Sequence, residues 1–411
     1  MENSKKIILT LSIICLFDVT KYTIPIEPPT LYFFLLYLCM FIVVYLAFSS
    51  VEFKNAPKIF KKIFFIYLIY NFLIIIIGLI NSENYWDYKN VFIVYLPTVI
   101  ISLVIFIGIR FEKNLIIYRF AIERIFPIVI IFGIIFIIFL NGTKYFNAVS
   151  RLGAPIYFFI LAIPFLKRGH IVLIIFISIM CIYVDPGWRT NLMTIVCCSI
   201  FVIMHYLSFL TKKLLNFIGV LVLLMPLILI YSGVKTGSDI FQNLSPESTV
   251  FKDTRKTGGY DTTGNTRSFL YFEVFNSIKN KNTNLLIGGG AANGYQTFFF
   301  QDDKVSTSVN RERYNTEVRF LNTLNKSGII GVTLELLIIF ITAFFAINKS
   351  NNDLSKLFGL FLIFSWALYF VEMPVFFNGM YFFYYLTIGM CLNQSFRDST
   401  NEQIKFFFKS L

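Results

Sequence analysis

The chain has 411 residues, of which 57% are hydrophobic and only 14% are charged, and its formal net charge is +13. Apolar stretches of the roughly 20 residues needed to cross a bilayer recur along it, which excludes a soluble globular fold and indicates a polytopic helical membrane protein. The positive charge is attributed to membrane orientation and not to nucleic acid binding, because the basic residues are not interleaved with stacking aromatic residues in a soluble domain.

The hydropathy pattern predicts about 12 transmembrane helices and therefore an all-α fold. The predicted spans are 7–24, 31–50, 60–80, 91–110, 121–140, 152–167, 170–184, 188–209, 213–233, 327–347, 355–373 and 376–392. We expect the first span to be retained, because Lys5 and Lys6 precede it but no small-residue cleavage site follows it.

Lysine and arginine placement predicts that both termini face the cytoplasm, because basic residues in short loops favour the inner side. Strict alternation of the spans puts nineteen basic residues in inner segments and five in short outer ones. The predicted organisation is nine spans within 1–233, an extracytoplasmic loop over 234–326, three spans within 327–392 and a cytoplasmic tail over 393–411.

Several kinds of chemistry are not indicated by the sequence. All six cysteines fall in apolar spans, so we expect no disulfide framework in the outer loop. The two histidines, His170 and His205, lie at predicted inner helix ends and do not make a metal site. The glycines at 288–290 are not followed by the Lys-Ser/Thr pair of a phosphate-binding loop. We therefore predict neither a metal ion nor a cofactor.

Charged residues near the apolar layer are costly and usually mark a substrate path. On the predicted outer side they are Arg151, Asp185, Arg189, Arg267, Glu273, Glu317, Arg319 and Glu372. Arg189 lies in the turn DPGWRTNLM, and the span before it has only about fourteen apolar residues, or roughly 21 Å of helix. A hydrocarbon layer is about 30 Å thick, so we expect this turn in a recess. A snorkelling arginine, or one paired with Asp185, is the alternative.

The outer loop contributes two further segments. Within 260–295, a polar turn precedes Arg267 and a stretch whose apolar residues recur at helical spacing. This pattern predicts an amphipathic helix along the bilayer, with Arg267 at its N-terminal end. The second segment, 315–337, runs directly into a span, so we expect Glu317 and Arg319 to lie over the outer mouth of that span.

Over about 180–392 the chain resembles the bacterial O-antigen polymerase and O-antigen ligase superfamily of membrane glycosyltransferases. The turn GWRTN at 187–191 is similar to the family's Ser-Arg-Thr-Gly-like turn, and TRS at 266–268 followed by IGGG at 287–290 is similar to its loop arginine and Gly-x-Gly patch. Ligases have a His-Asn-x-x-Leu motif before a Gly-x-x-Gly helix start. Here Glu317 and Val318 replace the histidine and asparagine, which favours a polymerase.

The resemblance implies a GT-C-like helical bundle that moves a glycan from undecaprenyl diphosphate to a sugar hydroxyl of another lipid-linked repeat unit. The reaction would take place at the outer face of the bacterial cytoplasmic (inner) membrane, for O-antigen or capsule, without a cofactor. The implied partners are the lipid-linked oligosaccharide, the lipid bilayer and a chain-length regulator. An O-antigen ligase and a flippase or transporter of lipid-linked oligosaccharide remain alternatives.

In this interpretation Arg189 and Arg267 clamp the donor diphosphate, because guanidinium groups stay charged and bind phosphate oxygens bidentately. Glu317 is the predicted base that takes the proton from the acceptor hydroxyl. The remaining outward charges are predicted to bind substrate: Arg151, Arg319, Glu372, Asp185 and Glu273.

Overall fold

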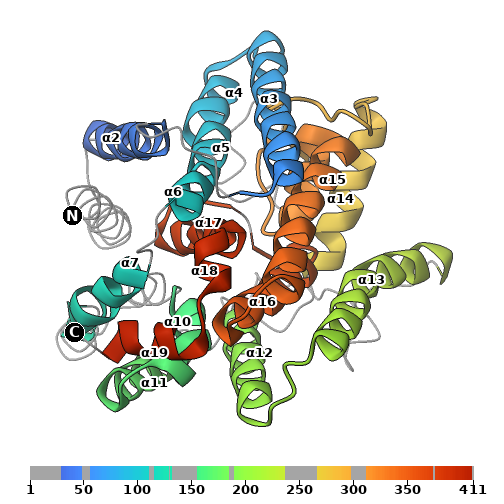
Figure 1. The fold of residues 1–411 in the computed structure, drawn as a ribbon. Helices are drawn as coiled ribbons and strands as arrows, with labels where there is room; N and C mark the ends of the chain where they lie inside the picture. The colour runs from blue at the N-terminus through green and yellow to red at the C-terminus, as the bar shows by residue number, and fades with distance from the viewer. Residues whose placement is uncertain are drawn as a thin grey trace.

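The computed structural model of the chain describes residues 29–48, 56–110, 115–128, 130–131, 155–184, 189–236, 266–297, 312–373 and 375–409. Helices form nearly all of the regular structure in these ranges, and the two strands there have two residues each. β1 (Tyr295–Gln296) and β2 (Glu312–Arg313) pair antiparallel. The predicted all-α class is confirmed (Figure 1).

The helices follow one another in chain order from blue to red in Figure 1. They are α2 (Pro29–Phe48), α3 (Lys58–Ile80), α4 (Tyr85–Lys89), the π-helix η2 (Asn90–Tyr95), α5 (Leu96–Ser102), α6 (Val104–Arg110), α7 (Leu115–Phe120), the π-helix η3 (Ala121–Ile125), α10 (Ile156–Ala162), the 3₁₀-helix η4 (Ile163–Phe165), α11 (Arg168–Val184), α12 (Arg189–Tyr206), α13 (Lys212–Thr236), α14 (Thr266–Asn280), α15 (Arg319–Asn348), α16 (Asp353–Tyr369), α17 (Gly379–Leu392), α18 (Gln394–Asp398) and α19 (Asn401–Lys409).

Three helical segments in the described part of the chain are long and apolar enough to cross a membrane. They are Lys58–Ile80, Tyr85–Arg110 and Arg319–Asn348, and the second comprises α4, η2, α5 and α6. Shorter apolar helices accompany them, among them Thr190–Tyr206 and Gly379–Leu392. These segments indicate a membrane protein, whereas the number of twelve spans stays a prediction. The predicted span 7–24 lies outside the described residues, as does half of 121–140.

The core of the bundle is formed by α16 and α17, whose side chains are almost all buried. α17 packs closely on α6, because each helix presents a glycine at the crossing. A Cβ atom added to Gly108 would lie 2.5 Å from the carbonyl oxygen of Leu386, and one added to Gly389 would lie 2.3 Å from that of Ile105. Only residues without a side chain allow this approach of two backbones.

α15 is interrupted at Gly328, where φ is 62° and ψ is −167°. This conformation is open almost only to glycine, so the sequence permits a break here. The interruption frees backbone groups that a helix would otherwise pair, and the loop after α14 satisfies them. Ile329 and Ile330 donate their N–H groups to the carbonyls of Leu285 and Leu286, at 3.0 and 3.1 Å.

The same loop pairs with the other side of the break. Gly289 and Gly290 donate N–H groups to the carbonyls of Asn325 and Lys326, each at 3.0 Å. Gly288 also has a positive φ of 82°, and a Cβ atom on it would lie 2.4 Å from the Lys326 carbonyl oxygen. The glycine-rich segment 288–290 thus packs directly against the break at Gly328.

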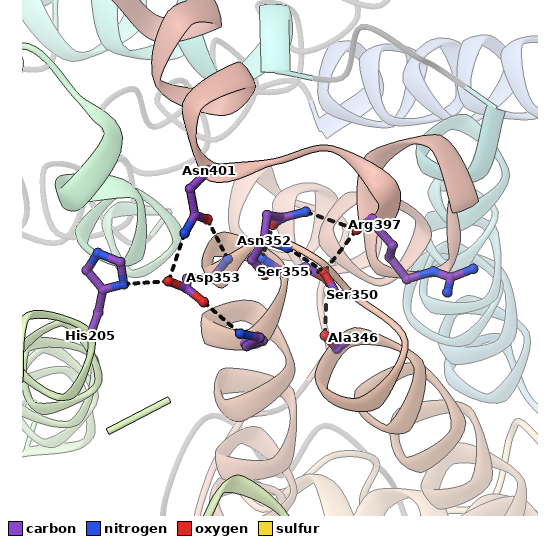
Figure 2. A network of polar contacts seen from close by, with 9 residues as sticks. His205, Ala346, Ser350, Asn352, Asp353, Ser355, Arg397 and Asn401 are labelled. Carbon is purple, nitrogen blue, oxygen red and sulfur yellow. Dashed lines mark hydrogen bonds and ion pairs between the residues drawn. The ribbon is translucent and has the colours of Figure 1, made fainter. Parts of the chain in front are cut away.

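A polar network joins the opposite end of α15 to α12, α16 and the C-terminal segment (Figure 2). The Asp353 carboxylate accepts hydrogen bonds from Lys356 at 2.8 Å and Asn401 at 2.9 Å, and it lies 3.2 Å from His205 Nδ1. Asn352 caps α16 by accepting from the N–H of Ser355 at 2.8 Å. The alternation of predicted spans assigns these residues to one side of the membrane, and they do meet at one place.

Candidate functional site

A cavity of about 60 Å³ lies where the first part of α15 meets α3, η2, α5 and α17. A water molecule needs roughly 10–15 Å³ of such space, so the cavity has room for a few waters or a small polar group. Its polar and charged lining comes from Tyr67, Asn71, Tyr95, Thr98, Asn315, Arg319, Asn322, Thr323, Lys326, Ser327, Glu335 and Tyr385.

Arg319 forms a buried ion pair at this cavity. Its Nε and Nη2 atoms both lie 3.1 Å from Oε2 of Glu335, beyond the break in the same helix. The guanidinium also donates to the Tyr385 hydroxyl at 3.4 Å and lies 5.2 Å from the centre of the Tyr369 ring. The positive charge of Arg319 is therefore balanced within the protein.

Lys326 is the second buried cation, with only 3% of its surface exposed. Its ammonium group donates to the side-chain oxygen of Asn315 at 2.8 Å and lies 5.9 Å from the centre of the Tyr95 ring. Within the described ranges no carboxylate lies at ion-pair distance from this group. A buried ammonium group with only an amide partner retains unused donors, which favours an acceptor in the cavity.

The segment before α15 holds Asn315 in place. Tyr314 donates its hydroxyl to Oδ1 of Asp87 at 2.7 Å, which ties this segment to α4. Burial is the main cause that raises the pKa of Tyr314 above its ordinary value, and the Asp87 carboxylate acts in the same direction. The hydroxyl therefore stays protonated and remains a donor, so the Tyr314 anchor positions the amide that contacts Lys326.

Glu372 connects the start of α12 to the start of α15. Thr190 donates its hydroxyl to the Glu372 carboxylate, and the backbone N–H of Arg319 donates to the Glu372 carbonyl at 3.2 Å. The backbone of Arg189, the first residue of α12, lies next to this junction. Three of the predicted site positions are thus brought together at one end of the bundle.

α14 reaches the same junction. Tyr271 donates its hydroxyl to the carbonyl of Phe370 at 2.7 Å and stacks with Phe320 at a centroid distance of 6.1 Å. Arg267 belongs to the first turn of α14, one turn before Tyr271, so its backbone is at this end of the helix. The side chains of Arg189 and Arg267 lie outside what the structure describes, as do residues Arg151 and Asp185 entirely.

The two other predicted carboxylates are placed differently. Glu317 is exposed and lies two residues before α15. Its neighbour Arg319 forms its ion pair with Glu335. Glu273 is fully buried between α14 and β1, where both of its oxygens accept from the Thr297 hydroxyl, at 2.9 and 3.1 Å. Glu372, by contrast, is half-buried beside the helix starts.

Lys326 and Glu335 are site residues that the sequence analysis did not single out. Lys326 is the last residue of the predicted outer loop, where a lysine is ordinary. Glu335 lies within an apolar run, and a lone carboxylate at membrane depth was a usable signal.

Among the described residues, no group of three or more His, Cys, Asp or Glu side chains is placed so that it could bind a metal ion. Comparison of the chain with protein-family models, curated proteins and solved structures finds no match.

Proposed function

We propose that the chain is a polysaccharide polymerase of the bacterial cytoplasmic membrane. In this proposal it transfers a glycan from undecaprenyl diphosphate to a sugar hydroxyl of another lipid-linked repeat unit. The observation that carries the proposal is the junction at Glu372, where the starts of α12 and α15 meet. α12 and α14 begin with the segments that carry Arg189 and Arg267, the two arginines that the family resemblance selects, and α15 begins at Arg319, which is predicted to bind substrate.

The proposed reaction is a displacement at the anomeric carbon of the donor sugar. The acceptor oxygen forms the new glycosidic bond, the bond to the diphosphate oxygen breaks, and the lipid diphosphate leaves with the electron pair. Arg189 and Arg267 stabilise the negative charge that develops on this leaving group, which in a poorly hydrated site contributes several kcal/mol. The proton of the acceptor hydroxyl passes to a carboxylate.

The base is assigned to Glu317 or to Glu372. A carboxylate acts efficiently as a base near neutral pH when burial raises its pKa. Glu317 is exposed, two residues before the start of α15, where an acceptor sugar can reach its carboxylate. Glu372 is already half-buried beside the two helix starts, and this placement supports it as the second candidate.

Transport of a lipid-linked oligosaccharide is the second candidate function, because α15 is interrupted next to a polar cavity. Transporters often use interrupted helices to build substrate sites within the membrane. The break at Gly328 and the buried Lys326 are features of that kind.

One assay tests the proposal against its alternatives. The purified chain in lipid vesicles is incubated with a lipid-linked repeat unit, and the products are separated by length. A ladder of growing chains supports the polymerase, and transfer to a second lipid identifies a ligase. Movement of the unit across the bilayer without a new bond identifies a transporter and contradicts the polymerase.

A further inference from the structure

The charges that line the α15 cavity do not cancel. Within the described part of the chain, its ionisable lining consists of Arg319, Glu335 and Lys326, together with tyrosine hydroxyls. Arg319 and Glu335 neutralise each other through contacts of 3.1 Å. Among the residues that the structure describes, one positive charge, that of Lys326, is left over in a buried position where an uncompensated charge is costly. The cavity is therefore matched to a ligand with a single negative charge.

Hydroxyl donors complement this charge. Tyr67 lines the cavity and has no hydrogen-bond partner for its hydroxyl among the residues that are described. The Tyr385 hydroxyl accepts from Arg319 at 3.4 Å, which leaves its own proton free to donate. An ammonium group and two hydroxyl donors around a small space suit an oxyanion, since each oxygen accepts several hydrogen bonds.

The available space selects among monoanions. A volume of about 60 Å³ accommodates a carboxylate group, whose carbon carries only one further substituent. A phosphodiester would need room for two substituents, and a diphosphate carries more negative charge than one lysine balances. A whole sugar ring does not fit, so the rest of the ligand would extend out of the cavity.

We propose that the α15 cavity binds the carboxylate of an acidic sugar, such as a uronic acid residue. Lys326 would be the counter-ion, and Tyr67 and Tyr385 would be hydrogen-bond donors. That the carboxylate is carried by a sugar rests on the proposed function. This cavity differs from the proposed diphosphate site of Arg189 and Arg267, because its single uncompensated lysine balances one negative charge and a diphosphate carries more than one. It would restrict the substrates to repeat units that contain an acidic sugar.

The test is thermal unfolding of the purified full-length chain, titrated with glucuronate, glucose and inorganic phosphate at constant ionic strength. We expect glucuronate to raise the melting temperature saturably and glucose to leave it unchanged. Lys326→Met should weaken glucuronate binding by at least about thirtyfold, as expected for loss of a buried charge partner. Lys213→Met, at an exposed position in α13, is the matched control and should bind like the wild type.

Tyr385→Phe provides a second variant should Lys326→Met fail to fold, because it removes one hydroxyl and keeps the ring. We expect about tenfold weaker glucuronate binding, the value for one hydrogen bond to a charged group. The proposal is overturned by a wild-type protein that glucuronate does not stabilise, or by unchanged binding in both variants. A larger Lys326-dependent shift with phosphate would also overturn it, by assigning the cavity to phosphate.

The product-ladder assay separates this inference from the proposed function. If the chain polymerises a repeat unit but does not bind glucuronate, the proposed carboxylate site is wrong and the proposed polymerase function stands. If the chain binds glucuronate through Lys326 but forms no ladder, the carboxylate site is supported and the polymerase function is contradicted.

Discussion

The guanidinium group of Arg319 and the carboxylate of Glu335 are 3.1 Å apart, although sixteen positions separate them in one helix. An unbroken helix would put them about 24 Å apart along its axis, because each residue adds about 1.5 Å. The break at Gly328 allows the two parts of α15 to turn toward each other. The ion pair and the interrupted backbone are therefore two parts of one arrangement.

We predict that Arg319→Met destabilises the folded chain by about 3–5 kcal/mol, because it leaves the Glu335 carboxylate buried without its partner. The double variant Arg319→Met/Glu335→Leu should recover most of this loss, since it removes both buried charges. The measurement is chemical unfolding of the single and double variants in the same detergent. A double variant at least as unstable as Arg319→Met would contradict the ion-pair account.

Gly328→Ala should destabilise the chain as well, for a reason that lies in the backbone. The glycine conformation alone costs another residue about 1–3 kcal/mol, and the added Cβ atom would lie 2.3 Å from the carbonyl oxygen of Leu286. Melting temperatures of purified variants test this. Gly169→Ala is the matched control, because that position in α11 has open space around it and an ordinary φ. Equal melting temperatures for the two variants would argue against a required break.

Hydropathy predicted the helices better than it predicted their interruptions. The span predicted over 60–80 is α3, Lys58–Ile80, because a continuous apolar run both forms a helix and marks its length. The span predicted over 327–347 corresponds to the part of α15 after Gly328, but the helix itself begins at Arg319. The break depends on hydrogen bonds with the loop around 285–290, a contact that no local pattern contains.

The stability of the Asp353 network should depend on acid pH. Contact with His205 is the largest cause that lowers the pKa of Asp353 well below its usual value near 4; burial opposes it, and Lys356 and Asn401 also lower the pKa. Because the folded state binds this proton less tightly than the unfolded state, the stabilisation is complete above about pH 4 and is lost as the pH falls toward the lowered pKa.

Asp353→Asn tests whether Asp353 causes this loss of stability at acid pH. We expect the variant to be less stable than the wild type by about 1–3 kcal/mol near neutral pH, because its partners lose a charged acceptor. Its melting temperature should then fall less than that of the wild type between pH 6 and pH 3. Parallel pH profiles for the two proteins would show that Asp353 is not the group responsible.

The candidate site was predictable only in part. The sequence grouped Arg189, Arg267, Arg319 and Glu372 by their side of the membrane, and the described backbone brings their segments together. It gave no reason to pair Arg319 with a residue inside the apolar run, because an unbroken helix forbids that contact. The role of Lys326 was equally hidden, since burial depends on how α3, η2 and α17 close around it.

We predict that Arg267→Ala leaves the chain folded in the membrane while the product collapses from a ladder to single repeat units. The reason is the loss of a cation that stabilises the leaving diphosphate. Product length is measured in vesicles, after the amount of folded protein has been matched. Lys279→Ala is the control, because it removes a positive charge from an exposed position at the other end of α14. A normal ladder from Arg267→Ala would remove Arg267 from the site.

The identity of the base is tested by comparing Glu317→Gln with Glu372→Gln, since each variant keeps the shape of the side chain and removes its ability to take a proton. The variant at the true base should lower the turnover rate by about 10² to 10⁴. Glu372→Gln keeps an oxygen that can accept the Thr190 hydroxyl, so its fold should survive, and circular dichroism and melting temperature check this. A loss at Glu317 alone would mean that the exposed carboxylate becomes enclosed when substrate binds. Wild-type rates from both variants would leave the reaction without either carboxylate as its base.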